Sequence, residues 1–264
     1  MFFNKKNNPP IRFSTVITFS SLDDPFIDAC IDGVMSTSEC VVCLAYETLF
    51  DGADERRFLD AVISRNKHKA VAFKILPLPV GIDSPDNSFF HNYIRRRGFE
   101  VVQASADYTM FVDGDEIADA GLLSAWKARS RKRPASVLFS SYWYFREAIY
   151  QSTTLETAAI MVNNSVYAKR VPADNTELLN FHRHERQDYR FDPMERVKKP
   201  VVFHHFSWVR TKEEMLKKVK NWGHRLQEDW VSKVDAEFSH PFNGTDFVHG
   251  YRYRTVANRF NITL

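Results

Sequence analysis

Short apolar runs rich in β-branched and aromatic residues alternate with helix-like segments through the first half of the chain. The strand-like runs cover residues 12–19, 39–45, 69–76 and 108–112, and helices begin near residue 22 and cover residues 53–65 and 89–99. Repeated β-α-β units of this length indicate parallel strands with helices on both faces of the sheet. The sequence therefore predicts an α/β fold with a mostly parallel central sheet flanked by helices.

The second half of the chain is less regular. We expect helices at 117–131 and 211–230, and strands at 135–145, 157–162 and 200–208. Residues 172–194 have poor periodicity and many charges, which is typical of a loop that is mobile or faces an acceptor substrate. The 264 residues are 44% hydrophobic, enough for one large core, and they contain no repeat or clean linker. We expect one domain at 12–264 after a disordered lead-in at 1–11.

The strand-like run at 108–112 stops abruptly at Asp113 and Asp115, with only Gly114 between them. In open α/β sheets, ligand sites lie at the carboxyl ends of the strands. Mg²⁺ is usually held by one or two carboxylates together with substrate phosphates, and Gly114 would remove bulk where a phosphate must come close. The pattern therefore favours a site for a divalent cation, although Asp-Gly-Asp is also an ordinary turn sequence.

Two adjacent histidines, His204 and His205, close the last predicted strand. Adjacent residues of a strand face opposite ways, so at most one of them points into a given site. Imidazole binds borderline metals such as Mn²⁺, and a histidine beside Asp115 would complete a mixed oxygen and nitrogen ligand set. A pair of hydrogen-bonded histidines at a strand end is the alternative.

Basic residues stand where they could meet phosphate groups. Thr211 is a plausible N-cap of the helix that follows, and the exposed N–H groups of a helix start favour phosphate. Arg210 and Lys212 lie beside it. The basic run at 95–97, which ends in Arg97, precedes the Asp-x-Asp strand and could form bidentate phosphate contacts. Solvated basic helix faces are the alternative in both places.

Composition excludes several classes of protein. The net charge is only +3, from 36 basic and 33 acidic residues, which is too weak to indicate a nucleic-acid partner. No run approaches the roughly 18 apolar residues of a membrane span. The N-terminus has no apolar core of a signal peptide, and three cysteines indicate a reducing compartment. We expect a soluble cytoplasmic protein.

The chain resembles glycosyltransferases of the GT-A fold, close to the family 2 type. Four segments carry the resemblance: FVDGDE at 111–116, SSYWY at 140–144, HFSWVR at 205–210 and KEEM at 212–215. Their order and spacing are similar to those of bacterial and large-virus sugar transferases with LDADE, GSYDY and HYGWVR…EKM segments. The resemblance covers roughly residues 13–224.

The resemblance implies a metal-dependent enzyme. Asp115 would be the main ligand of Mn²⁺ or Mg²⁺, Asp113 its partner at the metal or the ribose, and His205 the matching histidine. Residues 12–116 would form the nucleotide-sugar half and residues 117–264 the acceptor half. The reaction would move a sugar from a UDP- or GDP-linked donor to a hydroxyl of a saccharide or glycan, with Arg97, Arg210 and Lys212 near the diphosphate.

The catalytic base stays open, because Trp143 stands where the resembling segment has a carboxylate. An inverting enzyme needs a group that takes the acceptor proton. By position, Glu147 and Asp188 are the principal candidates, with Glu156 and Glu185 as further ones. A retaining enzyme would not need a base at this place.

Two other function classes compete. A nucleotidyltransferase would also join an α/β sheet to Asp-bound metal, but it should show a glycine- and arginine-rich phosphate loop, which residues 18–23 lack. A non-catalytic carbohydrate- or nucleic-acid-binding module would use the basic run at 129–133 and the aromatic run at 142–145. Metal-dependent binding of a nucleoside diphosphate separates the transferase from that module.

Overall fold

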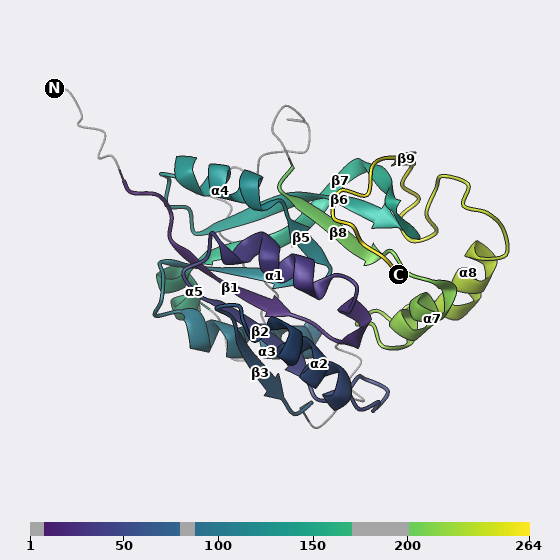
Figure 1. Ribbon diagram of the computed structural model, residues 1–264, viewed down its shortest axis with the longest axis horizontal. Coiled ribbons are helices and arrows are strands. Elements are labelled where there is room, and N and C mark those ends of the chain that lie inside the picture. Colours follow the sequence, from purple (N-terminus) through teal and green to yellow (C-terminus); the bar gives the residue numbers. More distant parts are fainter. Residues whose placement is uncertain (1–7, 80–87, 171–200) are drawn as a thin grey trace.

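The computed structural model describes residues 8–79, 88–170 and 201–264. Their strands form one nine-stranded sheet in the order β3-β2-β1-β4-β7-β6-β8-β5, with β9 paired to β7 (Figure 1). The strands are β1 Phe13–Thr18, β2 Val41–Tyr46, β3 Ala72–Leu76, β4 Tyr108–Asp113, β5 Glu116–Ala118, β6 Ser136–Phe145, β7 Glu147–Asn163, β8 Phe203–Trp208 and β9 Tyr253–Thr255.

The first four strands form the predicted parallel sheet. β1 pairs in parallel with β2 and β4, and β2 pairs in parallel with β3. Helices α1 (Ile27–Met35) and α2 (Arg56–Asn66) share one apolar cluster with one face of β1, while α3 (Ser88–Val102) packs against the other face. Covering both faces explains why β1 is buried almost throughout, since strands of a doubly covered sheet have no solvent side.

The expectation of a mostly parallel sheet is wrong for the second half. β7 runs antiparallel to β4, β6 and β9, and β5 runs antiparallel to β8, whereas β6 and β8 are parallel. The reason is local: β6 and β7 are joined through Arg146 alone, which has a φ of 58°. A connection this short only permits an antiparallel pair. The sheet is therefore mixed.

Three predicted elements differ from the observed ones. The helix expected at 117–131 starts with the short strand β5, and α4 (Ala120–Arg129) follows behind an Asp119 N-cap. The strand expected at 157–162 is the end of the longer β7. The helix expected at 211–230 is two helices, α7 (Lys212–Lys220) and α8 (Trp230–Glu237). The loop predicted at 172–194 lies outside the described residues.

A long-range contact marks where the long predicted helix ends. Asn221 forms the C-cap of α7, and its side chain donates to the Asp51 carboxylate at 2.9 Å. The Asp51 backbone N–H donates in return to the Asn221 side chain at 3.0 Å. At the other end of α7, the predicted Thr211 N-cap is confirmed and forms a capping box with Glu214. The loop after β2 is thus tied to the end of α7.

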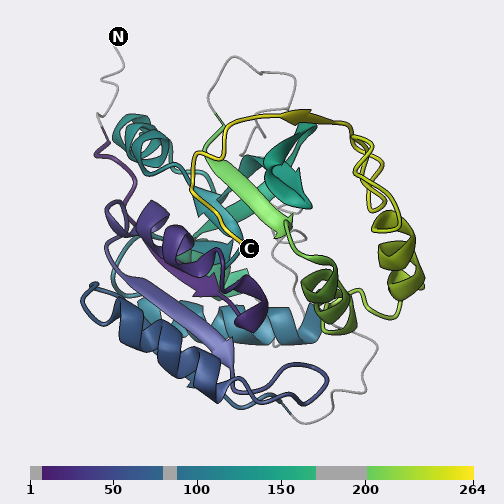
Figure 2. The ribbon, with the colours of Figure 1, turned by 45° about the vertical axis from the view of Figure 1, so that its right-hand side comes forward.

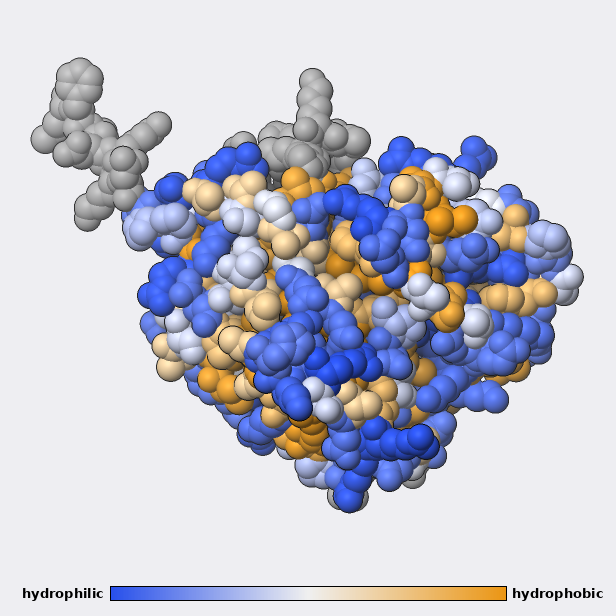
Figure 3. Space-filling model, viewed as in Figure 1, coloured by the Kyte–Doolittle hydropathy of each residue, from blue (hydrophilic) through white to orange (hydrophobic). Residues whose placement is uncertain are grey.

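The C-terminal segment returns across the second half of the sheet. Figure 2 shows the chain leaving β8 through α7 and α8 and coming back along the yellow segment that contains β9. Phe260 then packs on His204 and Phe206 of β8, with ring centroids 4.8 and 5.7 Å apart. No helix in the described ranges is long and apolar enough to cross a bilayer. Hydrophilic side chains cover most of the face in Figure 3, with apolar ones scattered between them.

Gly114 has a different role from the predicted one. A Cβ placed on it would lie 2.8 Å from the Phe19 Cβ and 3.1 Å from the Asp23 Cβ. The missing side chain therefore makes room for the turn that follows β1, which includes the 3-10 helix η1 (Ser21–Asp23). The expectation that this glycine clears space for a ligand is replaced by a packing role.

We predict that Gly114→Ala lowers the free energy of unfolding by about 1–3 kcal/mol, because the new methyl group overpacks a buried contact. Chemical denaturation measures the change. Gly121→Ala is the matched control, since a Cβ there meets only the Asp119 Oδ1 at 3.4 Å. That control should leave stability unchanged or slightly higher, because alanine favours a helix. Equal stability of both variants would contradict the packing role.

Candidate active site

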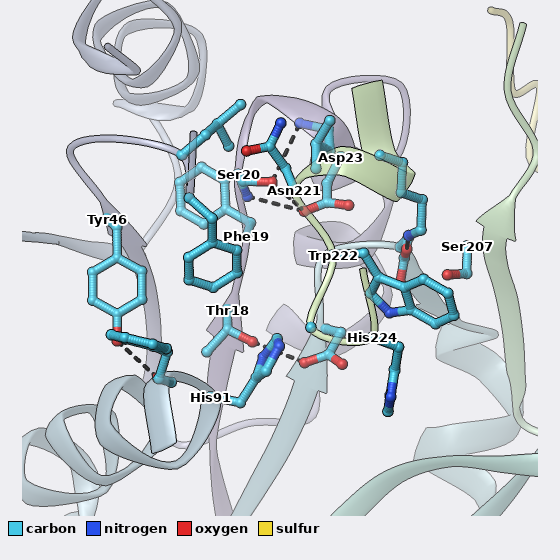
Figure 4. Close-up of a pocket in the computed structure, with 18 of the residues that line it drawn as sticks. Thr18, Phe19, Ser20, Asp23, Tyr46, His91, Ser207, Asn221, Trp222 and His224 are labelled. Atoms are coloured by element: carbon cyan, nitrogen blue, oxygen red, sulfur yellow. Dashed lines mark hydrogen bonds and ion pairs between the residues drawn. The ribbon is translucent and has the colours of Figure 1, made fainter. Parts of the chain in front are cut away.

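A cavity of about 390 Å³ opens at the carboxyl ends of β1, β2, β4 and β8, all on one edge of the sheet. Figure 4 shows its side chains, with Tyr46 at the left of the view, Ser207 at the right, and His91 and Trp222 between them. The lining combines aromatic rings with a charged centre formed by Asp23, Asp113, Asp115, His205 and Lys218. The predicted Asp-x-Asp pair thus reaches a cavity, as a strand-end ligand site requires.

Asp113 is held by two neighbours. Thr18 at the end of β1 donates its hydroxyl to Oδ1 at 2.8 Å, and Arg95 of α3 donates to Oδ1 at 2.7 Å and Oδ2 at 2.9 Å. Burial opposes ionisation of this carboxyl, but the charges of Arg95 and His91 outweigh burial and lower its pKa. Arg95 is therefore the site arginine. Arg97 instead pairs with Glu100 at 2.8 Å, and neither arginine belongs to the cavity lining that the described residues form.

Asp115 is buried, and a histidine, a lysine and an arginine surround it. His205 Nε2 lies 3.2 Å from Oδ1, and Lys218 Nζ and Arg210 Nη2 lie 3.3 and 3.6 Å from Oδ2. Burial opposes ionisation, but Lys218, His205 and Arg210 together hold the pKa of Asp115 well below its usual range. The aspartate also raises the pKa of His205 against the effect of burial. Asp115 is thus ionised at neutral pH.

Lys218 is a site residue that the sequence analysis did not single out. Its side chain is only 10% exposed and points at Asp115. The signal was present in the helical spacing, because Met215, Lys218 and Val219 share one buried face of α7. Lys212 takes the solvated role instead, pairing with Asp235 of α8 at 2.8 Å.

Arg210 connects the charged centre to the first half of the chain. It is 2% exposed, donates to the backbone oxygens of Ser207 and Leu22, and pairs with Asp23 at 3.4 Å. These contacts fix its guanidinium behind Asp115. Arg210 therefore contacts the site through Asp115. Neither its own side chain nor the helix start beside it belongs to the cavity lining formed by the described residues, so the predicted diphosphate contact stays a prediction.

The two histidines of β8 face opposite ways, as predicted. His205 points at Asp115, whereas Nδ1 of His204 shares a 2.8 Å hydrogen bond with the Tyr144 hydroxyl. Burial lowers the pKa of His204 to about 4, so this ring is neutral and structural. His205 Nδ1 is buried and has no hydrogen-bond partner within the described residues.

Two further acids carry raised pKa values. Burial and the nearby Asp113 raise the pKa of Glu116 to about 8, and its carboxyl accepts the Asp113 backbone N–H at 3.0 Å. Burial and the nearby Asp115 raise the pKa of Asp23 to about 6. At pH 7 the ionised carboxylates are those of Asp23, Asp113 and Asp115, and the cations facing them are Arg95, Arg210 and Lys218. Burial lowers the pKa of Lys218, and the charge of Asp115 opposes this. The centre is close to neutral without any ligand.

The predicted base candidates lie elsewhere. Glu147 is exposed at the start of β7, and Glu156 in β7 accepts the Tyr251 hydroxyl. Neither belongs to the cavity lining that the described residues form. Glu185 and Asp188 fall outside the described part of the chain. Trp143 does line the cavity, with its ring 4.6 Å from that of His205.

The residues present fit a divalent ion in part. Neighbouring ligands of an octahedral ion lie roughly 3.0 Å apart for bonds of about 2.1 Å. The 3.2 Å between Asp115 Oδ1 and His205 Nε2 is close to this separation. Both carboxylate oxygens of Asp113 accept hydrogen bonds from Arg95. No group of three His, Cys, Asp or Glu side chains in the described ranges is arranged to hold a metal. Protein atoms thus offer two adjacent ligands, and a bound substrate or water would supply the others.

No known family model matches the sequence, and no curated protein does. Among solved structures, a mannosyltransferase from Pyrobaculum calidifontis, in complex with GDP-Man and Mn²⁺, is 12% identical with a TM-score of 0.43 over 84% of this chain and 65% of that one. The glycosyltransferase GlyE of Streptococcus pneumoniae is 10% identical with a TM-score of 0.37, over 88% and 66%. The chain spans about two thirds of each of these proteins.

A third structure is of a different enzyme class. The inositol-1-phosphate CTP transferase of T. maritima is 8% identical with a TM-score of 0.42, over 86% of this chain and 98% of that one. With identities and TM-scores this low, the similarities assign neither a family nor an activity to the chain.

The raised pKa of Glu116 predicts a stability change with pH. Its folded pKa of about 8 lies above the ordinary value of 4.5, so its contribution is fully present below pH 4.5 and is lost as pH rises through 8. We expect Glu116→Gln to flatten this part of the stability curve in chelator, because glutamine stays neutral and still accepts the Asp113 N–H. Denaturation between pH 5 and pH 9 measures it. Identical curves for variant and wild type would contradict a buried, protonated Glu116.

Proposed function

We propose that this chain is a metal-dependent glycosyltransferase of the GT-A type, which moves a sugar from a UDP- or GDP-linked donor to a hydroxyl of a saccharide. One observation carries the proposal. A strand-end Asp-x-Asp pair reaches a cavity in which Asp115 meets His205, Lys218 and Arg210 within 3.6 Å. A site of this kind combines oxygen and imidazole ligands for a cation with fixed positive charges for an anion.

The charge balance favours a diphosphate as that anion. The three carboxylates and three cations of the centre nearly cancel, so a divalent ion alone would leave an excess of positive charge in a buried place. The diphosphate of a nucleotide sugar removes that excess. Ion and diphosphate should therefore bind together, each strengthening the other.

The proposed ligands of Mn²⁺ or Mg²⁺ are Asp115 and His205, with Asp113 beside them and held by Arg95. Such an ion stabilises the negative charge that develops on a departing nucleoside diphosphate. Lys218 and Arg210 add fixed charge on the same side. They suit this role better than Lys212 and Arg97, whose charged ends pair with surface carboxylates.

The two ends of the cavity suit the two substrates. Tyr46, Phe50 and Phe90 line it on the side of β2 and α3, where a flat nucleobase would find aromatic surface. Trp143 and Trp208 line it on the side of β6 and β8, and aromatic faces of this kind pack well against sugars. This arrangement supports a donor half at 12–116 and an acceptor half at 117–264.

We predict that Asp115→Asn lowers hydrolysis of UDP-glucose or GDP-mannose by at least about 100-fold, because oxyanion-type electrostatic groups contribute this much. Released nucleoside diphosphate measures the rate. Asp107→Asn is the matched control, since it changes an exposed carboxylate at the other end of the same strand. Wild-type hydrolysis by Asp115→Asn would contradict the assignment.

Lys218→Gln should weaken binding of UDP or GDP about 10- to 100-fold in the presence of Mn²⁺, because a charge-assisted hydrogen bond is worth about 1.5–3 kcal/mol. Lys220→Gln, an exposed lysine of the same helix, should bind as the wild type does. Calorimetry compares the two variants. If both lose affinity equally, the effect comes from overall charge, and Lys218 has no specific role.

A further inference from the structure

We propose that His249 is the general base of the sugar transfer, with Asp246 as the carboxylate that positions it. This assignment rests on the proposed function, and it names the group that takes the proton of the acceptor hydroxyl. Both residues belong to the loop between α8 and β9. Neither stood out in the sequence.

The acids of the cavity are already engaged. Asp23, Asp113 and Asp115 are the acidic side chains that line it within the described chain, and each is paired with an arginine or a lysine. The paired cations lower the pKa values of Asp113 and Asp115, so these two carboxylates are weak proton acceptors. Asp23 has a raised pKa, but its carboxylate already accepts the Ser20 N–H at 2.9 Å and pairs with Arg210 at 3.4 Å. The base must therefore be sought among the other polar groups that face the cavity.

His249 is placed at the acceptor end. It lines the cavity and its side chain is 32% exposed, so an incoming hydroxyl can reach it. Its ring makes an edge contact with the ring of Trp143, with centroids 4.6 Å apart. The ring of Trp143 also contacts that of His205, with centroids again 4.6 Å apart. A single indole ring therefore separates His249 from the proposed metal ligand. Tyr251 stacks on the histidine at 5.0 Å and restricts the orientation of its ring.

Hydrogen bonds fix the carboxyl group of Asp246 within the loop. Its side chain is fully buried and accepts the backbone N–H groups of Val248, His249 and Tyr251 at 2.5–3.0 Å, and the Tyr253 hydroxyl at 3.1 Å. Its Oδ1 lies 3.8 Å from His249 Nδ1, slightly beyond a hydrogen bond. Catalytic hydrogen bonds are often this long before substrate binds. With Nδ1 facing the carboxylate, Nε2 is the nitrogen that can accept a proton.

The surroundings of His249 favour its neutral form, which a general base requires. Burial lowers the pKa of His249, and the charges of Asp246 and Glu156 only partly oppose this, so the ring is neutral at pH 7. The titratable groups facing it are Asp246 and Tyr251 of its own loop, Glu156 of β7 and His205 of β8. His224 also lines the cavity and contacts Trp222, with ring centroids 4.8 Å apart. Within the described residues it forms no ion pair with a carboxylate.

The step balances as a single displacement. The acceptor oxygen forms a bond to the anomeric carbon while its proton moves to His249 Nε2. The bond between the anomeric carbon and the diphosphate oxygen breaks, and its electron pair leaves with the nucleoside diphosphate. The imidazolium, stabilised by Asp246, then gives its proton to water. A displacement of this kind inverts the configuration of the anomeric carbon.

The test compares His249→Ala with wild type in Mn²⁺ and whichever of UDP-glucose and GDP-mannose the wild type hydrolyses. We expect the turnover rate to fall about 10²–10⁴-fold, the usual contribution of a general base. Affinity for UDP or GDP with Mn²⁺ should stay unchanged, which also shows that the variant folds. Added imidazole should restore part of the lost rate, and the acidic limb of the pH profile should disappear in the variant. His68→Ala, an exposed histidine after α2, is the control.

Two results would overturn the assignment. One is turnover by His249→Ala within about threefold of the wild-type rate. The other is a loss that imidazole does not restore, together with an equal loss in Asp188→Asn that leaves nucleotide binding intact, which would identify Asp188 as the base. His249→Gln repeats the comparison if the alanine variant does not fold. A wild-type protein that binds neither UDP nor GDP with Mn²⁺ would instead refute the proposed function, and the role of His249 with it.

Discussion

The buried charge of Asp115 is the interaction on which the rest of the structure depends. An ionised carboxylate in a protein interior is tolerated only when other charges compensate it, and removing one partner of such a group costs several kcal/mol. Here the compensation comes from His205 of β8, Arg210 just after it, and Lys218 of α7. Because Asp115 follows β4, the same contacts hold the second half of the chain against the parallel sheet of the first.

This arrangement links stability to chemistry. Of the charges that neutralise Asp115, Lys218 lines the cavity and would face a diphosphate, while Arg210 lies behind the carboxylate. Asn221 at the end of the same helix fastens α7 to the loop after β2. A fixed set of compensating charges needs little reorganisation when a charged substrate enters. The aromatic walls on either side then separate the donor end of the cavity from the acceptor end.

Patterns within short segments of the sequence predicted the strands and helices whose formation depends on neighbouring residues. The repeated alternation of strand-like and helix-like segments predicted parallel strands with helices on both faces, and β1, β2 and β4 are buried almost throughout. The break between α7 and α8 depends on a partner far along the chain, Asp51 for Asn221. The hairpin of β6 and β7 depends on the single connecting residue Arg146 and its positive φ. The residues of the site divide in the same way into those that the sequence predicted and those that it did not. Asp113 and Asp115 stand at the end of β4, and His205 lies within β8. Lys218 and His249 reach the cavity from a helix face and a loop, and Arg95 of α3 reaches Asp113, and these placements require tertiary packing.

The central claim is that cation and diphosphate bind at Asp115 as one unit, and calorimetric titration of Mn²⁺ with and without saturating UDP or GDP tests it most directly. The charge balance predicts weak Mn²⁺ binding to the free protein and binding at least about tenfold tighter in the presence of the nucleotide, with the reciprocal gain for the nucleotide. Equal nucleotide affinity in Mn²⁺ and in excess chelator would contradict it.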